Sequence, residues 1–581
     1  MPFQCRVGFQ RRAIAMRVFS HTLMLIGVVF LGAALRFWNL DAKSVWMDEV
    51  ITALFSLGRS YLDVPLEAAF SLSALDQLFT LKPATCAAIA QTVSTQSVHP
   101  PLFFCWLHDW LNWVNWLQPT DHTWVWKLRS LPALAGVGAI LTVYYLNRIA
   151  FSKSAALAGA IVMAVSPFAV YLSQEARHYT VPMLLLSLAL LGMIRIQQDF
   201  RQQRLQPVLW LGWVALNGVG FYVHYFFILA TIAQLLTLIA LLLKSRFSTL
   251  KAPIAFYRHS WLTLLFAVGG IGLIYLPWLP TFLSHVSRPE TDWLTPTQPG
   301  WLTAIAPLYQ LLAGWVLMAI ALPVENQPIW IVIPAAVLML LFSGWLTWQG
   351  LKGLQKLWQT PETHWETLTL ASFVGWVLVE FLAIVYLFHK DLTQVPRYNF
   401  IYYPAVCALV GASLGRVAEG EFTDAEPSKS ASSWLKTFAP IVLFGLLSCG
   451  FVVSDRVFLK PYQPQQVARM MQSSGSESTI VVMAHQDLQD IALGLSFALA
   501  LRENDPKTKF AFLTRSQGYG QVWENLKTPK ISDSSPQNLW IIAPGLRGKD
   551  FPQQLSLSRS VCNRDPNQYY RLGVPYQGYR C

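Results

Sequence analysis

Charged residues are scarce in this chain. Only 13% of its 581 residues are Asp, Glu, Lys or Arg, whereas soluble proteins carry about 25%. Hydrophobic residues make up 54% of the chain. Too few charged side chains remain to cover the surface of a water-soluble fold of this size. The composition therefore argues against a water-soluble enzyme, a disordered chain and a disulfide scaffold. It predicts a polytopic membrane protein.

Zinc-like and redox cysteine motifs are also missing. None of the 7 cysteines forms a CxxC pair or a cluster with histidine. Cys562 and Cys581 close the last segment and could pair if that segment is extracytoplasmic.

Basic residues outnumber acidic ones, with 43 Lys and Arg against 31 Asp and Glu. In a soluble protein this excess would suggest nucleic acid as a partner. In a membrane protein it is the ordinary result of Lys and Arg gathering in cytoplasmic loops. We expect membrane lipid, and no nucleic acid, as a partner.

Long uncharged runs recur along the chain, and a helix needs about 20 apolar residues to cross a bilayer. They lie at 18–35, 130–147, 154–174, 178–194, 205–243, 259–287, 293–324, 326–351, 398–415 and 437–454. A further run, 367–388, is interrupted only by Glu380, and 205–243 is long enough for two spans.

The positions of Lys and Arg orient these runs. The segments expected in the cytoplasm are 1–17, 148–153, 195–204, 244–259, 352–356 and 416–436. For all of them to lie inside, the runs near 100–117 and 301–321 must rest on the outer face. This leaves about eleven spans, or about thirteen if both runs cross. The outer segments are then 38–129, 173–178, 284–325 and 389–397.

Residues 456–581 are more polar than the rest of the chain. Three short apolar runs, beginning at Thr479, Lys509 and Leu539, are typical of strands, and a helical run from Asp490 follows the first. The predicted fold class is an all-α polytopic membrane protein over 18–455, with a small outward C-terminal α/β domain over 456–581.

Two adjacent acids, Asp48 and Glu49, follow the first predicted span within the apolar motif Trp46-Met47-Asp48-Glu49. Acids at a membrane surface are usually just solvated. Carboxylates held against the bilayer, however, can bind a cation or act as a general base.

Basic and histidine side chains are predicted at the same leaflet, mostly at the ends of spans. Each alone could be an ordinary helix-end anchor or cap. The polar residues expected there are His99, Arg129, Glu175, Arg177, His178, Tyr179, His224, Tyr225, Lys390 and Arg397.

Cations collected at one interface suit a lipid phosphate. Carboxylates opposite them suit an acceptor hydroxyl that must lose a proton. Together they predict group transfer from a lipid phosphate.

These residues resemble the motifs of the GT-C membrane glycosyltransferases, particularly the bacterial branch akin to protein O-mannosyltransferases and aminoarabinose transferases (the dolichyl-phosphate-mannose-protein mannosyltransferase-like family). The matching features, in order, are Trp46–Glu49, His99-Pro100-Pro101-Leu102, Arg129–Ala133, Ser166-Pro167, Glu175–Tyr179 and His224-Tyr225. The resemblance covers roughly residues 18–245, extends more loosely through Arg397-Tyr398, and does not reach 456–581.

The resemblance implies an inverting transfer from a polyprenyl-phosphate sugar on the extracytoplasmic side. It implies Asp48 as the base with Glu49 beside it, and a donor-phosphate site at Arg129, Arg177 and, more weakly, Arg397. We group His178 and Lys390 with that phosphate site. We expect contacts to substrate from His99, Glu175, Tyr179, His224 and Tyr225.

The metal-dependent oligosaccharyltransferase branch carries an acidic DxD-type signature in the second outer loop, which this chain lacks. We therefore expect no metal and no other cofactor. The acceptor can be a lipid, a glycan or a protein, and the sugar a hexose or a pentose. Envelope glycan or lipopolysaccharide assembly at the plasma membrane is the expected setting.

Two other functions fit a polytopic membrane protein. A transporter or flippase of lipid-linked sugars would show internal repeats and midplane charges, but this chain shows no convincing repeat and places its ionisable residues at one face. The other is a structural or sensor protein whose outer domain binds a ligand.

Overall fold

The computed structural model describes residues 21–117, 123–247, 253–295, 301–419, 427–472, 478–505, 507–531 and 536–581. The chain divides into two compact units. The helical unit comprises Met1–Leu40, Val98–Phe103 and Ser130–Phe458. The sheet unit comprises Asp41–Ser97, Phe104–Arg129 and Leu459–Cys581. The predicted cytoplasmic segment 1–17 lies outside the described residues.

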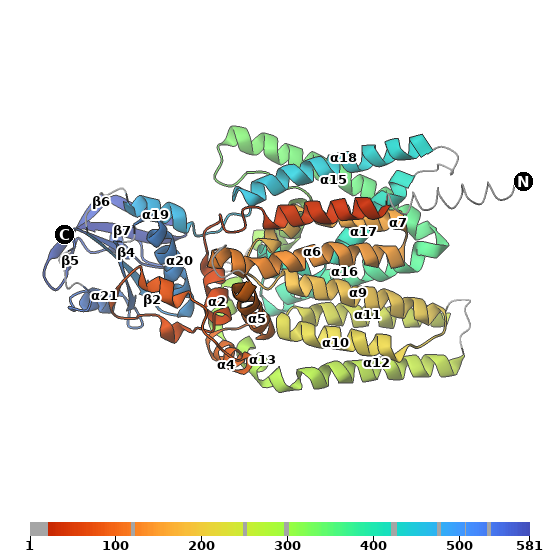
Figure 1. Cartoon of the computed structure of the whole chain (residues 1–581), viewed down its shortest axis with the longest axis horizontal. Coiled ribbons are helices and arrows are strands. Elements are labelled where there is room, and N and C mark those ends of the chain that lie inside the picture. Colours follow the sequence, from red (N-terminus) through yellow and green to blue (C-terminus); the bar gives the residue numbers. More distant parts are fainter. Residues whose placement is uncertain are drawn as a thin grey trace, which may run out of the picture. The chain divides into compact units, whose positions relative to one another are not determined.

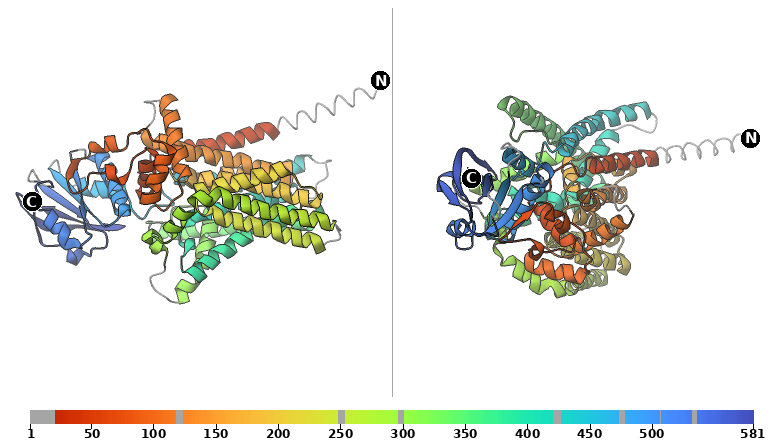
Figure 2. Two further views of the ribbon diagram at one scale, coloured as in Figure 1. Left: turned by 90° about the horizontal axis from the view of Figure 1, so that it is seen from below. Right: turned by 60° about the vertical axis from the view of Figure 1, so that its left-hand side comes forward.

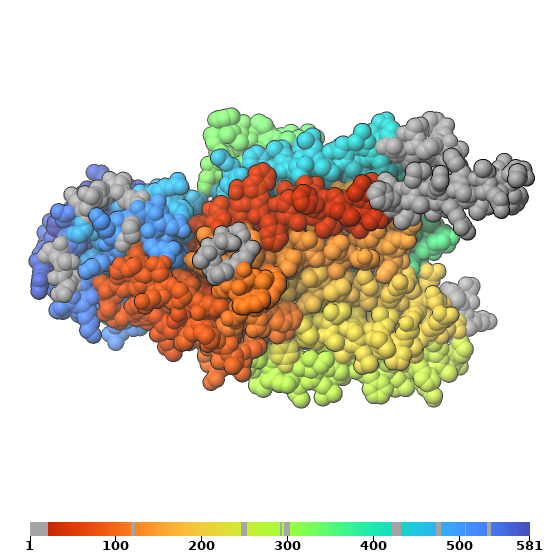
Figure 3. Space-filling view, viewed as in Figure 1, coloured from red at the N-terminus to blue at the C-terminus, as the bar shows by residue number. Residues whose placement is uncertain are grey.

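The helical unit is a bundle of long apolar helices, which run side by side in Figure 1 and in the left view of Figure 2. Its first helix, His21–Phe37, lies along the surface of the bundle in Figure 3 (red). The elements that follow are α6 (Trp124–Ala150), α7 (Lys153–Ala164), α8 (Pro167–Ser173), α9 (Thr180–Arg201), α10 (Pro207–Val223), α11 (Phe227–Phe247), α12 (Ile254–Tyr275), η2 (Leu276–Trp278), α13 (Leu279–Val286), η3 (Pro289–Leu294), α14 (Trp301–Ala319), α15 (Ile329–Gln359), α16 (Pro361–Phe388), η4 (Leu392–Gln394), η5 (Pro396–Ile401), α17 (Tyr403–Glu419) and α18 (Pro427–Val453).

Within the described residues, eight helices are long and apolar enough to cross a membrane, or nine if the bent pair α7–α8 is one span. Helices His21–Phe37 and α10 are apolar but shorter. The prediction of a polytopic helical membrane protein is confirmed. Three expected spans, His21–Phe37, α10 and α17, are not among these eight helices, whereas α14, expected on the outer face, is.

Helix α17 is expected to cross but is not among the long apolar helices. Its residues are small and mostly buried against α7 and α15. A Cβ on Gly411 would meet the Gly159 Cα at 2.4 Å, so the two backbones touch here. A helix surrounded by protein needs little hydropathy of its own, because small residues that allow close packing hold it in place.

Helix α14 is long and apolar enough to cross a membrane. The positions of Lys and Arg along the chain instead predict that this segment lies on the outer face. The interfacial position stays a prediction. Near its start, the Ala304 carbonyl accepts from the Tyr386 hydroxyl at 2.8 Å. Near its end, the Met318 carbonyl accepts from Ser166 at 3.3 Å. Helix α14 thus contacts α16 near its start and the cap of α8 near its end.

The break between α7 and α8 is fixed by a buried arginine. Pro167 cannot continue α7, so the two helices are bent by 59°. The last carbonyls of α7, on Met163 and Ala164, accept from the Arg36 guanidinium at 2.9 and 3.0 Å. Ser166 then caps α8 by accepting from the Ala169 N–H at 3.1 Å. This break positions the turn at 174–179.

The sheet unit combines the first long loop with the C-terminal residues. Its sheet has seven strands in the order β1-β3-β2-β4-β7-β6-β5. The strands are β1 (Ala69–Ser71), β2 (Thr479–His485), β3 (Lys509–Thr514), β4 (Asn538–Ile542), β5 (Gln554–Ser556), β6 (Val561–Leu572) and β7 (Val574–Arg580). The helical elements of the unit include α2 (Met47–Ser56), η1 (Tyr61–Asp63), α3 (Ala74–Leu78), α4 (Cys86–Gln96), α5 (Leu102–Leu117, from Phe104 on), α19 (Pro464–Gln472), α20 (Leu488–Asn504), α21 (Tyr519–Asn525) and η6 (Gly548–Asp550).

Strands β2, β3 and β4 are parallel and form the centre of the sheet. Helix α20 packs on one face, where Gly494 lies against Phe512 and Met483. Helix α21 packs on the other, where Val522 joins Ile480 and Val482 in one apolar cluster. The predicted C-terminal α/β domain, with strands beginning at Thr479, Lys509 and near Leu539, is confirmed.

One strand of this sheet was not predicted. Strand β1 comes from the first loop and pairs antiparallel with β3, with Phe70 opposite Phe510. Two disulfides also lie in the unit, one between Cys562 and Cys581, as their position suggested, and an unforeseen one between Cys86 and Cys105.

Candidate functional site

The helical unit gathers six of the predicted site residues into one cluster. We call His99, Arg177, His178, Tyr179, His224 and Arg397 the cationic cluster. Arg177, His178 and Tyr179 lie in the turn between α8 and α9, His224 follows α10, and Arg397 lies in η5. Local chain breaks create these turns: α8 ends at Ser173, and α10 ends where His224 adopts an extended backbone.

The two arginines of the cluster converge on one aromatic ring. The Arg177 and Arg397 guanidinium carbons lie 5.9 and 6.0 Å from the centre of the buried Tyr179 ring. A terminal nitrogen of Arg177 also lies 3.3 Å from His99 Nε2. Two cations thus face the same ring, an arrangement that an anion between them would stabilise.

The three histidines form a contiguous row beside the arginines, with His99 edge-on to His178 and His224 tilted against it. Ring centres lie 4.8 Å apart for His99 and His178, and 4.5 Å apart for His178 and His224. Phe400 follows in the row, with its ring centre 4.8 Å from that of His224. Burial is the main cause that lowers the pKa of each histidine well below its ordinary value, and the charge of Arg177 contributes in all three. The histidines are therefore neutral at pH 7, and they can donate or accept hydrogen bonds without adding charge.

Tyr225 lies apart from this row of histidines, in a hydrogen-bonded group of its own. Its hydroxyl lies 2.7 Å from His285 Nδ1 and accepts from the Trp278 indole at 3.0 Å. His285 is buried. Sequence reasoning missed His285 and Trp278, although both lie in or beside the outer segment predicted to begin at 284.

Glu175 and Lys390 flank the cluster in the chain. Glu175 is buried in the same turn as Arg177, whose N–H donates to the Glu175 carbonyl at 2.8 Å. Lys390 follows α16 and is half-buried. Its neighbour Asp391 is fixed at the start of η4, where it accepts from the Thr393 N–H at 3.0 Å. Their predicted roles stay predictions.

The acidic motif belongs to the sheet unit, in the first turn of α2. Glu49 and Arg129 form an ion pair there whose side chains are each only 1% exposed. The Arg129 Nε donates to one Glu49 oxygen at 2.8 Å, and a terminal nitrogen donates to the other at 2.7 Å. Arg129 also donates to the backbone carbonyls of Lys43 and Ser44, at 3.0 and 3.3 Å. This geometry fixes the start of α2.

Asp48, beside that pair, is buried to 8% exposure. The preceding residue, Trp46, has Lys460 over its ring at 4.3 Å. The pKa of Tyr462 is raised, mainly because the side chain is buried. The nearby carboxylates of Asp490 and Asp48 raise it further. The segment that leads into α19 therefore borders the acidic motif.

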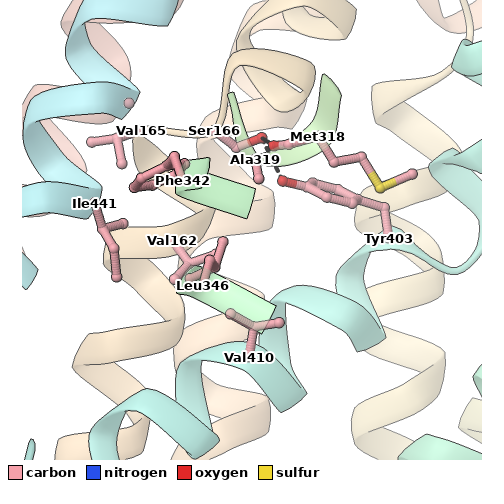
Figure 4. Close-up of a pocket in the computed structure, with 11 residues that line it drawn as sticks. Val162, Val165, Ser166, Met318, Ala319, Phe342, Leu346, Tyr403, Val410 and Ile441 are labelled. Atoms are coloured by element: carbon pink, nitrogen blue, oxygen red, sulfur yellow. Dashed lines mark hydrogen bonds between the residues drawn. The ribbon is translucent and has the colours of Figure 1, made fainter. Parts of the chain in front are cut away.

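A small apolar cavity lies elsewhere in the helical unit, between α7, α14, α15, α17 and α18 (Figure 4). Val162, Phe342 and Leu346 are part of its lining, and the Tyr403 hydroxyl donates to Ser166 at its edge. No charged residue and none of the predicted site residues lines it. Across the described ranges, no group of three or more His, Cys, Asp or Glu side chains has the arrangement of a metal site.

Comparisons with known proteins give one sequence match. Residues 107–271 match the family model for dolichyl-phosphate-mannose-protein mannosyltransferases. This range contains Arg129, the turn at 175–179 and His224-Tyr225. No curated protein matches the chain.

Several solved structures are similar at low sequence identity. ArnT from Cupriavidus metallidurans in the apo state is 14% identical, with a TM-score of 0.47, covering 92% of this chain and 94% of that one. The same protein bound to undecaprenyl phosphate is 13% identical, with a TM-score of 0.47 and 97% of both chains covered. The apo oligosaccharyltransferase of Archaeoglobus fulgidus is 14% identical, with a TM-score of 0.46. This chain, with 83% of its residues covered, spans only 64% of that enzyme's length.

The resemblance drawn from the motifs is thus confirmed in the part of the chain that carries most of them. Residues 107–271 are related to the dolichyl-phosphate-mannose-protein mannosyltransferase family.

Proposed function

We propose that the protein is an integral membrane glycosyltransferase. It moves a sugar from a polyprenyl-phosphate donor to a lipid, glycan or protein acceptor, with inversion at the anomeric carbon. The observation that carries the proposal is the cationic cluster, in which Arg177 and Arg397 approach one buried tyrosine ring beside three neutral histidines. Most of the cluster lies within the part of the chain related to mannosyltransferases.

The cluster suits a phosphate that leaves as an anion. As the bond between the anomeric carbon and the phosphate oxygen breaks, the electron pair stays on that oxygen. Arg177 is buried and Arg397 is half-buried, so these cations stabilise the developing charge more than fully exposed cations would. The neutral histidines add hydrogen-bonding groups around the phosphate without requiring counter-ions. Lys390 is the further cation that we assign to this site.

Asp48 supplies the base. The acceptor hydroxyl attacks the anomeric carbon from the face opposite the leaving phosphate, and its proton passes to the Asp48 carboxylate. General-base assistance of this kind contributes about 10²–10⁴-fold to a rate. Glu49 holds Asp48 in position through its ion pair with Arg129, because that pair fixes the first turn of α2.

The reaction takes place on the extracytoplasmic side of the plasma membrane in this proposal. Both disulfides lie in the sheet unit, which carries Asp48, and disulfides persist in oxidising compartments. The basic segments predicted in the cytoplasm meet at a different place in the helical unit, where Arg201 lies 3.6 Å from Glu366 and Lys244 lies 5.2 Å from the Trp365 ring centre. Cell-envelope glycan or lipopolysaccharide assembly is the setting that we propose.

Deleting the gene and comparing the extracted envelope lipids and glycans by mass spectrometry tests this function. The glycosyltransferase predicts that one product loses a hexose or pentose increment, and that plasmid-borne wild-type protein restores it. A transporter or flippase of lipid-linked sugars would instead leave single-step sugar additions intact and change only the side of the membrane on which the donor accumulates. An unchanged set of envelope lipids and glycans would contradict the proposal.

A further inference from the structure

The parallel centre of the sheet unit has its first strand, β2, between the two that follow it, β3 and β4. The chain passes from β2 to β3 on one side, then crosses back to β4 on the other side of β2. The connecting helices α20 and α21 therefore lie on opposite faces, as their contacts with Phe512 and with Val482 show. In sheets of this order, ligands bind outside the carboxyl ends of the strands, where the direction of winding reverses.

Polar side chains occupy that edge and connect its loops. Asp490, at the start of α20 after β2, pairs with Arg515 after β3 at 2.9 Å, with the side chains 13% and 20% exposed. The Arg515 guanidinium lies 5.8 Å from the Tyr519 ring centre. The Tyr519 hydroxyl donates to the Pro544 carbonyl in the loop after β4, at 2.6 Å. The loops after all three parallel strands are thus joined by these side chains.

The first loop contributes a fourth segment to the same edge. Glu67 accepts from the Thr514 N–H at 2.7 Å and from Asn525 at 3.0 Å. It also lies 3.8 Å from His485 at the end of β2. Burial lowers the pKa of His485, so this side chain is neutral at pH 7. The edge is therefore built from both parts of the sheet unit.

The acidic motif is close to this edge within the same unit. Helix α2, which carries Asp48, packs against α20, which begins at the edge. Burial raises the pKa of Tyr462, and the charges of Asp490 and Asp48 raise it further. The acidic motif and the edge thus belong to neighbouring elements of the same unit.

The charges of the edge are nearly balanced. Glu67, Asp487, Asp490 and Asp550 are acidic, and Arg515, Arg547 and Lys549 are basic. An anion such as a phosphate finds no excess of cations here, in contrast to the cationic cluster of the helical unit. The rings of Tyr519 and Trp523 stack at 5.7 Å and are half-exposed. Flat aromatic rings beside carboxylate, guanidinium and amide groups suit a sugar, whose apolar face packs on a ring while its hydroxyls form hydrogen bonds.

We propose that this carboxyl edge, centred on Asp490, Arg515, Tyr519 and Trp523, binds the acceptor through an uncharged, hydroxyl-rich glycan portion. The inference rests on the proposed function and names the acceptor class. The cationic cluster then recognises the donor phosphate, and the sheet edge recognises the acceptor sugar.

Saturation-transfer NMR on the purified full-length chain tests the site, in a detergent without a sugar head group. The probe is a mixture of neutral hexose oligosaccharides. The variants are Asp490→Asn, which weakens the pair with Arg515, and Tyr519→Phe, which keeps the ring but loses the bond to Pro544. Arg580→Gln is the matched control, because Arg580 pairs with Asp565 at 3.8 Å and contacts Asn538 at the opposite, amino edge of β4.

The wild-type chain and Arg580→Gln should show saturation transfer to the sugar ring protons, and Asp490→Asn should bind about tenfold more weakly. Tyr519→Phe should retain part of the binding. Polyprenyl phosphate binding, followed by tryptophan fluorescence, should be the same in all four proteins. Absence of transfer in the wild type, equal transfer in Asp490→Asn, or stronger transfer to phosphorylated than to neutral sugars would overturn the inference. Failure of the proposed function is read separately, from the envelope products of the gene deletion.

Discussion

Arg129 and Arg177 look alike in the sequence, since each begins or precedes a predicted span. Their surroundings differ. Arg129 is held by both oxygens of Glu49 and by two backbone carbonyls. Arg177 lies beside an aromatic ring and a neutral histidine. The motifs located both residues, but the partner of Arg129 lies 80 positions away in the chain, and no local pattern indicates that pairing. His285 was missed for the same reason, because its partner Tyr225 lies 60 positions away in the chain.

Replacing Arg177 with glutamine should weaken polyprenyl phosphate binding at least about tenfold, because a charge-assisted contact to phosphate is lost. The thermal unfolding temperature should change little. Binding of polyprenyl phosphate to the purified protein, followed by tryptophan fluorescence, measures the effect. Arg195→Gln is the control, since Arg195 is exposed and donates to Gln198 at 3.3 Å. Equal affinity in Arg177→Gln would remove this residue from the phosphate site.

Replacing Arg129 with leucine should act on stability instead. It leaves the Glu49 carboxylate buried without its cation, which costs about 3–5 kcal/mol. Differential scanning fluorimetry should show a lower unfolding temperature, and the double variant Arg129→Leu/Glu49→Gln should recover part of the loss. Normal unfolding of Arg129→Leu together with lost polyprenyl phosphate binding would instead return Arg129 to the donor site.

At the scale of elements, hydropathy and charge predicted where most helices lie in the chain. They did not predict which helices are packed inside the bundle. Residues 154–174 were expected as one span, and the chain divides them at Ser166-Pro167, where Arg36 satisfies the freed carbonyls. Helix α17 packs against α7 and α15, and its fit depends on a glycine contact with α7. Such contacts depend on which helices become neighbours in the folded protein. The hydropathy of a single segment carries no information about its neighbours.

Gly411→Ala should destabilise the helical unit by about 1–3 kcal/mol, since the added methyl group overlaps the Gly159 backbone and forces α7 and α17 apart. Gly375→Ala is the matched control in α16. Nothing lies within 4 Å of a Cβ there, so this change should be neutral or slightly stabilising. Thermal unfolding of the two variants in detergent measures the difference. Equal unfolding temperatures would show that the contact is not tight.

The three clustered histidines predict a pH dependence of stability. Their pKa values are lowered in the folded protein and near 6.5 in the unfolded chain. As the pH falls from 7.5 through 6.5, the unfolded chain binds protons that the folded protein does not, so the free energy of unfolding decreases. The unfolding temperature should be lower at pH 5.5 than at pH 7.5, and His178→Gln should reduce this difference. An unfolding temperature that rises on acidification would contradict the assignment of neutral histidines.

At the scale of the whole molecule, the sequence predicted a helical membrane protein with a C-terminal α/β domain, and both are present. It did not predict that the first loop belongs to the same compact unit as that domain. Strand β1 is only three residues long, too short to show a periodic pattern, and its partner Phe510 lies far along the chain. The Cys86–Cys105 disulfide was missed because only the terminal pair stood out by position.

The most direct test of glycosyl transfer is the Asp48→Asn variant expressed in the gene-deletion strain. Asn keeps the size of the side chain but cannot accept the acceptor proton, so the sugar increment seen by mass spectrometry should stay absent while protein level and membrane insertion are normal. Asp63→Asn is the control, since Asp63 is exposed and only caps a short helix through Ser60; it should restore the product. Full restoration of the product by Asp48→Asn would contradict the account.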